Sequence, residues 1–367
     1  WGNGHATLWR GLARALADRG HRLEFFERDV PWYAGHRDLT ELPGGALHLY
    51  RDLAEALPAA RAALAGADVA MVTSYCPDAL DATALVLDSP ARLKVFYDLD
   101  APVTLFRRRR GEPVEWVGPR AFADFDLVLS FTGGRTLDAL RDELGARRAA
   151  PLYGSVDPEV HRPSPRRPEF EADLSYLGTW AASRQDALER LFLVPAARLP
   201  DRTFVIGGSM YGPEFPWRAN VKYVRHLEPP LHASFFCSSP LTLNITRAEF
   251  AAFGHCPSGR LFEAAACGVP LLSDAWDGLD AFFRPGEEIL VASTSDEAVA
   301  AVTRPREELA RIGRRARERA LAEHTAESRA EALVAACDAA RGPPLTPNPL
   351  PPRGARGERG LEHGGSP

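Results

Sequence analysis

The sequence is poor in cysteine, and its cysteines form no pattern that would hold a metal ion. There are five in 367 residues, and no two of them make a C-x-x-C pair. This spacing argues against a zinc ribbon and against a thioredoxin-like redox site. We expect reduced thiols in a cytoplasmic protein. The five are Cys76, Cys237, Cys256, Cys267 and Cys337.

Long hydrophobic runs and a basic excess are also missing. No apolar stretch reaches about 18 residues, so we expect no membrane span, and we see no signal peptide. Lys and Arg number 44 against 49 Asp and Glu, a formal net charge of −5, so nucleic acid is not an expected partner. The four arginines at 107–110 are the local exception. We interpret them as a solvated face, with a contact to a phosphate or an anionic acceptor as the alternative.

The chain lacks an initial Met and also lacks an initial strand. It opens with Trp1 and a loop sequence at 2–5, and it continues directly into a helical pattern of Leu8, Leu12 and Leu16. Such a loop normally follows a buried parallel strand. We therefore expect that the native protein begins some residues earlier, and that without this strand the first sheet lacks a central member.

What the sequence does contain is a regular alternation of short apolar strands and helices. The first half predicts strands at 21–27, 69–73, 93–97 and 127–131. The second half predicts strands at 174–177, 203–206, 221–223, 241–245 and 271–273, with helices at 184–192 and 260–267. This alternation predicts an α/β fold of two Rossmann-like, doubly wound domains that face a cleft.

Composition places the domain boundaries. Five prolines between 151 and 168 break any regular element, so residues 151–170 are predicted to be a linker. The linker separates a first domain at 1–150 from a second at 171–341, which includes a long helical region at 305–341. Residues 342–367 contain seven Pro and six Gly, and we expect this tail to be disordered.

One segment of the second half suits a diphosphate. Ser258 can cap the helix that follows, Gly259 lets a phosphate approach the backbone, and Glu263 lies one turn further along. A helix N-terminus offers free N–H groups to an anion, and a carboxylate one turn in can accept both hydroxyls of a ribose. The alternative is a capped helix of the core with no ligand.

The chain resembles a known family through six stretches. It is similar to the GT-B glycosyltransferases and, more narrowly, to the CgeB-like (spore maturation protein) glycosyltransferase group, over about residues 1–330. The resemblance implies a nucleotide-sugar donor bound mainly by the second domain and an acceptor held by the first. The matching stretches are residues 1–7, 27–33, 96–100, 175–179, 243–247 and 260–268.

The resemblance gives roles to two residues of the donor segment. Glu263 falls where these enzymes keep the glutamate that binds ribose. Many retaining members carry a second glutamate eight positions earlier, and this sequence has His255 there, which favours an inverting mechanism. In inverting plant-type glucosyltransferases a His at this spacing meets a phosphate. A histidine without a ligand is the alternative.

The first domain supplies the expected catalytic residues. In inverting families a histidine placed like His5 is the general base that deprotonates the acceptor hydroxyl, and Asp98 or Asp100 would orient it. His5 could instead cap its helix or only contact the acceptor. Asp98 and Asp100 also read as a D-x-D metal motif, but the two-domain architecture makes this reading weak, and we expect no metal or other cofactor. The loop that would admit the acceptor consists of Gly2, Asn3 and Gly4.

Further residues of the second domain complete the predicted donor site. Arg184 and Arg247 could neutralise the diphosphate, because arginine forks fit phosphate oxygens, and a surface ion pair is the alternative for each. Asp274 follows the strand after the donor helix, where the sugar ring would lie. Asn244 and Arg260 belong to the matching stretches of the same site.

The sequence therefore predicts a glycosyltransferase of the hexosyltransferase class. It would move a sugar from a nucleoside diphosphate sugar to a hydroxyl acceptor. Two alternatives share the architecture: a catalytically idle protein that binds a nucleotide sugar, and a sugar-nucleotide epimerase.

Overall fold

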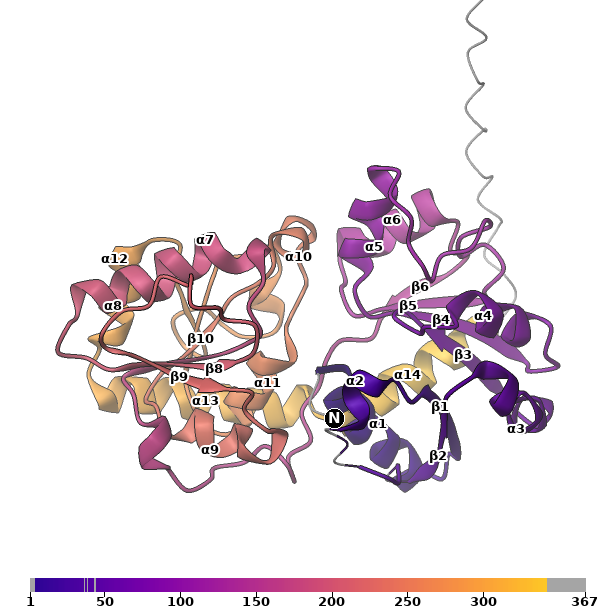
Figure 1. The fold of residues 1–367 in the computed structure, drawn as a ribbon, viewed down its shortest axis with the longest axis horizontal. Coiled ribbons are helices and arrows are strands. Elements are labelled where there is room, and N and C mark those ends of the chain that lie inside the picture. Colours follow the sequence, from indigo (N-terminus) through magenta and orange to yellow (C-terminus); the bar gives the residue numbers. More distant parts are fainter. Residues whose placement is uncertain (1–3, 36, 38, 43, 342–367) are drawn as a thin grey trace, which may run out of the picture.

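The computed structural model shows two α/β lobes side by side (Figure 1). It describes residues 4–341 except 36, 38 and 43; the side chains of residues 5, 32 and 33 are also not described. Gly2, Asn3 and the tail at 342–367 lie outside the described residues. No helix within the described part is both long and apolar enough to cross a membrane.

The first lobe begins with helix α1 and continues as the expected alternation. Its strands run in parallel, because each is followed by a helix or a long crossover. The elements are α1 (Gly4–Asp18), β1 (Leu23–Arg28), α2 (Pro31–Ala34), β2 (Gly45–Tyr50), α3 (Leu53–Ala65), β3 (Val69–Thr73), α4 (Ala79–Leu87), β4 (Leu93–Asp98), α5 (Ala101–Arg109), β5 (Leu127–Ser130), α6 (Arg135–Leu144) and β6 (Ala149–Pro151).

The sheet of the first lobe is in two pieces. β1 pairs with β2, while β3, β4, β5 and β6 form a separate four-stranded sheet. A cavity of about 1430 Å³ lies where the pieces do not meet, and residues of both β1 and β3 line it. Every residue of β1 is half-buried rather than buried.

The second lobe carries one six-stranded parallel sheet in the order β12-β11-β10-β7-β8-β9. The strand order reverses between β7 and β10, and a doubly wound sheet binds ligands in the crevice beyond such a point. The elements are η1 (Pro168–Phe170), β7 (Leu174–Leu177), η2 (Ala182–Arg184), α7 (Gln185–Leu188), η3 (Glu189–Leu193), α8 (Val194–Arg198), β8 (Phe204–Gly208), β9 (Val221–Arg225), η4 (Pro229–Leu231), α9 (His232–Cys237), β10 (Thr242–Asn244), α10 (Ala248–Phe253), α11 (Gly259–Ala266), β11 (Leu271–Ser273), η5 (Leu279–Ala281), β12 (Leu290–Val291), α12 (Ser295–Val302) and α13 (Arg306–Glu323).

Apolar side chains fill both faces of this second sheet. On one face Phe235 and Phe262 are fully buried with the helices α9 and α11. On the other face Leu188 and Phe192 pack with Ile312. Burial on both faces is the usual state of a parallel sheet covered by helices, and it makes α11 a rigid platform for the residues at its N-terminus.

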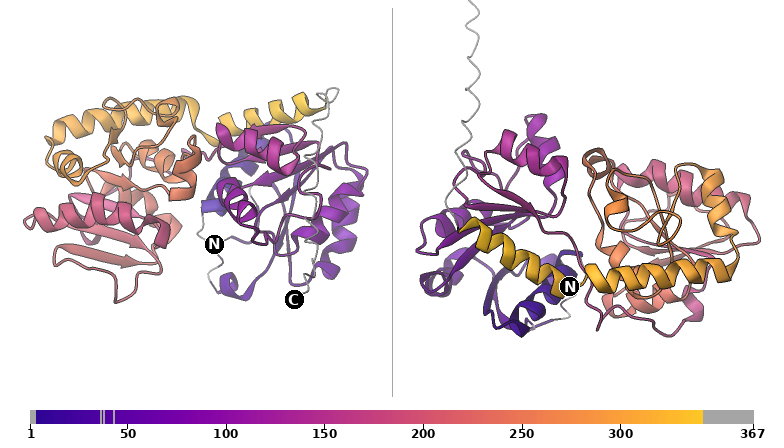
Figure 2. Two further views of the ribbon diagram at one scale, coloured as in Figure 1. Left: turned by 90° about the horizontal axis from the view of Figure 1, so that it is seen from above. Right: turned by 180° about the vertical axis from the view of Figure 1, so that it is seen from behind.

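The last helix, α14 (Ala326–Ala340), differs from the prediction. The sequence assigned all of residues 305–341 to the second domain, but α14 crosses to the first lobe and lies along α1 (Figure 2). There Ala330 and Leu333 are buried with Leu8 and Leu12. The first domain therefore contains a helix from each end of the described chain.

The chain crosses between the lobes twice, and the two crossings lie together. Val156 of the linker forms a bridge with Thr325, just before α14. The side chain of Arg329, 8% exposed, donates from Nε to the carbonyl oxygen of Gly154 at 3.1 Å and from Nη1 to that of Glu323 at 3.2 Å. These contacts make a compact hinge.

The arginines at 107–110 form ion pairs at the surface. Arg107 pairs with Glu115 at 2.9 Å and Arg109 with Glu143 at 2.6 Å. Pairs of this kind contribute little, roughly 0–1 kcal/mol each. The arrangement favours a solvated face over a phosphate site.

Candidate active site

Three arginines meet in the crevice where the strand order of the second sheet reverses. Arg184 ends η2 after β7, Arg247 lies in the loop after β10, and Arg260 is in the first turn of α11. Burial lowers the pKa of Arg184, and the positive charges of Arg260 and Arg247 lower it further. Arg260 and Arg247 are therefore both near enough to Arg184 for their charges to repel its guanidinium group.

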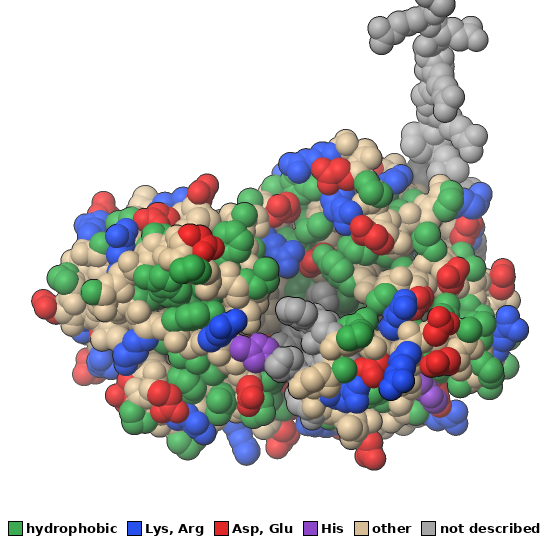
Figure 3. All heavy atoms as spheres, viewed as in Figure 1, with side chains coloured by type: hydrophobic (Ala, Val, Ile, Leu, Met, Phe, Trp, Pro, Cys, Tyr) green, Lys and Arg blue, Asp and Glu red, His purple; other side chains and the backbone are tan. Residues whose placement is uncertain are grey.

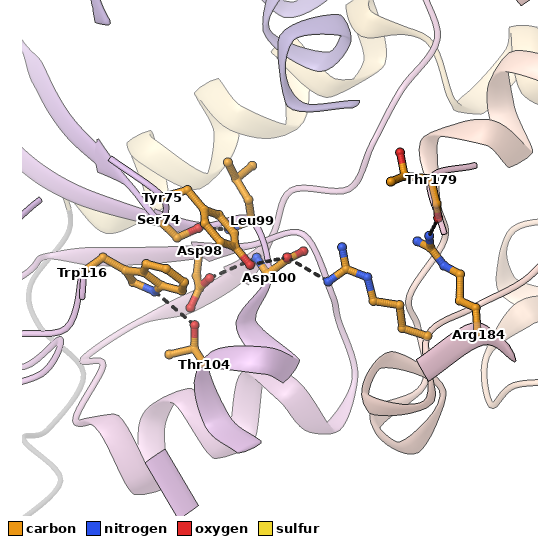
Figure 4. A network of polar contacts seen from close by, with 10 residues as sticks. Ser74, Tyr75, Asp98, Leu99, Asp100, Thr104, Trp116, Thr179 and Arg184 are labelled. Carbon is orange, nitrogen blue, oxygen red and sulfur yellow. Dashed lines mark hydrogen bonds and ion pairs between the residues drawn. The ribbon is translucent and has the colours of Figure 1, made fainter. Parts of the chain in front are cut away.

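Arg184 itself has little to hold it. Its Nη1 donates to the carbonyl oxygen of Thr179 at 3.0 Å (Figure 4). Its Nε is buried and has no hydrogen-bond partner in the part of the chain that the structure describes. A half-buried cation with an unused donor is the kind of group that an anionic ligand would complete.

Asn244 organises the N-terminus of α11. Its Oδ1 accepts a hydrogen bond from Ser258 Oγ at 2.7 Å and another from Arg260 Nη1 at 2.9 Å. Its Nδ2 donates to Ser273 Oγ at 3.0 Å. The guanidinium of Arg260 also lies over the ring of Tyr176, with its carbon 5.2 Å from the ring centroid.

The prediction that Ser258 caps α11 needs a correction. Ser258 occupies the N-cap position, but its side chain makes no hydrogen bond to the helix, because the hydroxyl donates to Asn244 instead. The first N–H groups of α11 therefore have no side-chain cap. An uncapped helix N-terminus beside cationic side chains favours an anion.

Glu263 lies one turn into α11, half-buried, next to the open backbone of Gly259. A Cβ atom at Gly259 would sit 3.5 Å from Glu263 Oε1. Two histidines that the sequence did not single out, His161 and His232, have ligand atoms within 4.8 Å of this carboxylate and of each other. His161 lies in the Pro-rich linker and belongs to no recognisable motif, so no local signal could have found it.

Across the cleft, Asp100 of the first lobe faces the arginines. Arg247 Nη1 lies 3.2 Å from Asp100 Oδ2, and Tyr75 Oη donates to the same oxygen at 2.6 Å. Figure 4 shows this first-lobe network opposite Arg184 and Thr179. The sequence placed Asp100 and Arg247 in separate roles, and the structure joins them in an ion pair between the two lobes. Tyr75 was not predicted.

Asp98 is withdrawn from the cleft. It is fully buried at the end of β4, and burial raises the pKa of its carboxyl group to about 7. Its Oδ1 accepts the backbone N–H of Asp100 at 3.0 Å. The alternation of side chains along a strand predicts that at most one of Asp98 and Asp100 faces the cleft. In the structure Asp100 faces it and Asp98 does not.

The expected base, His5, lies in the first turn of α1, and Gly4 begins this helix. The side chain of His5, and all of Gly2 and Asn3, lie outside the described part of the chain. The pairing of His5 with either aspartate therefore stays a prediction.

His255 lies at the boundary between the two lobes. Its carbonyl oxygen accepts the backbone N–H of Gly133 at 3.0 Å, and its own φ is +45°. The imidazole lies against Gly134 and Gly278, where a Cβ atom would collide with the ring. Both glycines also have positive φ. The structure thus makes His255 a contact between the lobes, and its Nδ1 is buried with no partner among the described residues.

Asp274 supports the loop that carries Arg247. Its two carboxylate oxygens each lie 3.1 Å from the backbone nitrogen of Thr246, and its Oδ1 accepts the Thr246 hydroxyl at 3.0 Å. Burial raises the pKa of Asp274 to about 6. The sequence expected this carboxylate beside the sugar ring, whereas the structure engages it with the neighbouring loop.

The surface between the lobes is hollowed, with basic and acidic side chains deep in the hollow (Figure 3). The cavity beside β1 reaches this hollow, because Tyr75, Asp100 and Arg247 are among its lining residues. Arg247 of the second lobe therefore lies at the edge of the cavity of the first lobe.

Comparisons with known proteins agree with this geometry. Residues 184–335 match the model of a family described as glycosyl transferase-like. The match contains Arg184, Arg247, Arg260 and Glu263. No curated protein sequence matches the chain.

Solved structures share the fold of most of the chain, across both lobes. Sucrose-phosphate synthase from Thermosynechococcus elongatus is 15% identical, with a TM-score of 0.61 over 88% of this chain and 90% of that one. Anabaena HepE in complex with UDP and glucose is 12% identical, with a TM-score of 0.65 over 92% and 96%. The catalytic domain of starch synthase IV from Arabidopsis thaliana, bound to ADP and acarbose, is 12% identical, with a TM-score of 0.64 over 93% and 96%.

The likeness to these structures shows the fold, and the family match adds the class of activity. The two lobes have the GT-B fold of glycosyltransferases such as HepE and sucrose-phosphate synthase. The matched segment, which holds the three arginines and α11, is glycosyl transferase-like.

Proposed function

We propose that the protein transfers a sugar from a nucleoside diphosphate sugar to a hydroxyl group, with the diphosphate in the arginine cluster. The observation that carries this proposal is the buried Nε of Arg184, unpartnered within the described part of the chain, near Arg247 and Arg260 and together with the uncapped N-terminus of α11. Among the described residues, only Arg247 of the three has a carboxylate partner. A diphosphate would relieve the repulsion and use the free Nε of Arg184.

The rest of the donor is oriented by α11. The uncapped helix N-terminus at Ser258 and Gly259 faces the phosphates, and Glu263 accepts the ribose hydroxyls one turn further. The names of two similar structures support this class of donor, since HepE is in complex with UDP and glucose and starch synthase IV is bound to ADP.

The acceptor binds on the first lobe, where His5 takes the proton of the attacking hydroxyl. We infer that the transfer of the sugar inverts the configuration at its anomeric carbon, because His255 occupies the position at which retaining relatives have a glutamate. Asp100 becomes free to orient His5 when Arg247 leaves it for the diphosphate, so donor binding prepares the base. The hinge allows the lobes to close over both substrates.

The narrower assignment rests on sequence alone. We place the protein in the CgeB-like group because of the six matching stretches, and in the cytoplasm because five scattered cysteines suit a reducing compartment.

Donor turnover tests the proposal. The wild-type protein should release nucleoside diphosphate from a nucleotide sugar, and His5→Ala should lose at least 100-fold of this rate, as expected for removal of a general base, while it binds the nucleotide with unchanged affinity. Binding without turnover in the wild type would favour an idle binding protein. An isomerised nucleotide sugar, detected by NMR, would favour an epimerase.

A further inference from the structure

Two histidines and a glutamate meet where the linker, α9 and α11 come together. His161 comes from the linker, His232 is the first residue of α9, and Glu263 lies in α11. One potential ligand atom from each lies within 4.8 Å of the other two. These residues are 71 and 31 positions apart along the chain, so only the fold brings them together.

His161 is the unusual member of this group. Its side chain is only 2% exposed. Both of its ring nitrogens are buried, and neither has a hydrogen-bond partner in the described part of the chain. A buried polar group without a hydrogen-bond partner is destabilising, so a histidine held in this way is expected to have a ligand.

His232 is held in the way that metal-binding histidines are. Its Nε2 lies 3.3 Å from the carbonyl oxygen of Leu227, and a contact of this kind fixes the orientation of a ring whose other nitrogen binds a metal. The carboxylate of Glu263 provides a negative charge beside the two imidazoles.

We propose that His161, His232 and Glu263 form a zinc site. Two imidazole nitrogens and one carboxylate are a ligand set of zinc sites that keep the fourth position open. Bond lengths of about 2.0–2.1 Å put tetrahedral ligand atoms about 3.3 Å apart, so small side-chain rotations would bring the three atoms into range. Calcium and magnesium would require mainly oxygen ligands, and one carboxylate does not supply them.

Zinc at this site would compete with the donor. This consequence rests on the proposed function, because it requires Glu263 to bind the ribose of the nucleotide. A carboxylate that coordinates zinc is not free to accept the two ribose hydroxyls. Zinc would therefore inhibit transfer by weakening donor binding, at a site separate from the arginines that hold the diphosphate.

Zinc titration of the metal-stripped full chain, without any nucleotide, tests the site. Isothermal titration calorimetry should show one zinc ion per chain, and His161→Ala and His232→Ala should each weaken binding at least tenfold. His21→Ala, which removes an exposed histidine of the first lobe, should leave it unchanged. Stoichiometric zinc binding that both site variants retain, or no zinc binding by the wild type, would overturn the proposal.

Further measurements distinguish loss of zinc binding from misfolding of a variant and from an effect on donor binding. Circular dichroism must show that each variant is folded, and Glu263→Gln provides a third ligand change, again with a loss of at least tenfold expected. Cobalt(II), used in place of zinc, should give the visible absorption of a tetrahedral site in the wild type and lose it in His161→Ala. Because no nucleotide is present, these results are independent of whether the protein binds a donor.

Discussion

Replacing Arg184 by methionine should change ligand binding and stability in opposite directions. Methionine keeps the unbranched length of the side chain and removes its charge. In the protein without ligand, Arg184 is partly desolvated, and Arg260 and Arg247 repel it. Its hydrogen bond to the Thr179 carbonyl offsets part of this cost. The variant should therefore be as stable as the wild type or more stable.

The magnitude for the bound state follows from the hydrogen bonds that Arg184 could give a diphosphate. A hydrogen bond to a charged group contributes about 1.5–3 kcal/mol. Loss of one such contact corresponds to a dissociation constant that is roughly 10 to 150 times larger. Because the charge also acts at a distance through a partly buried crevice, we expect a value in the upper half of this range at low salt.

Isothermal titration with a nucleoside diphosphate that binds the wild type measures the first effect, and urea unfolding measures the second. Arg190→Met is the matched control, since Arg190 is exposed in the neighbouring turn η3 and should change neither quantity. The reasoning fails if Arg184→Met binds the nucleotide within threefold of the wild type. It fails equally if the variant loses more than about 1 kcal/mol of stability, the net value of an ordinary hydrogen bond.

The remaining predictions concern the carboxylates on the two sides of the cleft. Removing both ribose hydroxyls from the nucleotide should weaken its binding to the wild type at least tenfold, and should leave its binding to Glu263→Ala unchanged. Titration calorimetry measures both affinities. Equal losses of affinity in the two proteins would exclude Glu263 as the ribose ligand. Asp100→Asn should strengthen nucleotide binding a few-fold by releasing Arg247, whereas Arg247→Ala should weaken it; a shift of both in the same direction would contradict the ion pair between the lobes. Burial raises the pKa of Asp98 to about 7, above its value of about 3.9 in the unfolded chain. Between these two pH values the folded chain binds one more proton than the unfolded chain. The contribution of Asp98 to stability therefore falls as the pH rises through this range. Asp98→Asn should therefore gain stability relative to the wild type from pH 4 to pH 8 in urea unfolding, and a constant difference would refute this.

The local pattern was sufficient to predict the scaffold of the site. The strands at 69–73, 174–177 and 271–273 have the predicted limits. Each is a short apolar run between polar or turn-forming residues, which leaves little choice of where the strand begins and ends. The helix with Glu263 begins at Gly259, one residue from its predicted start. Residues at the ends of such strands and helices lie at the cleft by topology, which is why the sequence could propose Arg184 and Arg247 as candidates; their role in donor binding stays a prediction.

Contacts between distant segments could not be predicted. Asp100 and Arg247 are 147 positions apart, and nothing in the pattern around either residue specifies the other. The alanine-rich sequence of α14 does not specify which lobe it packs on, and only the fold shows that it lies along α1. His161 lies in a segment with no periodicity, so only the folded linker reveals its position beside Glu263.

A thermal-shift panel of UDP, GDP, dTDP and ADP and their sugars tests the central claim most directly. At about 100 times its dissociation constant a ligand adds about 2.7 kcal/mol of stability, which for domains of this size raises the melting temperature by roughly 5–10 °C. We predict a rise of this size with at least one nucleoside diphosphate, and a much smaller rise in Arg184→Met. If none of these nucleotides raises the melting temperature of the wild-type protein, the arginine cluster is not a donor site and the account is wrong.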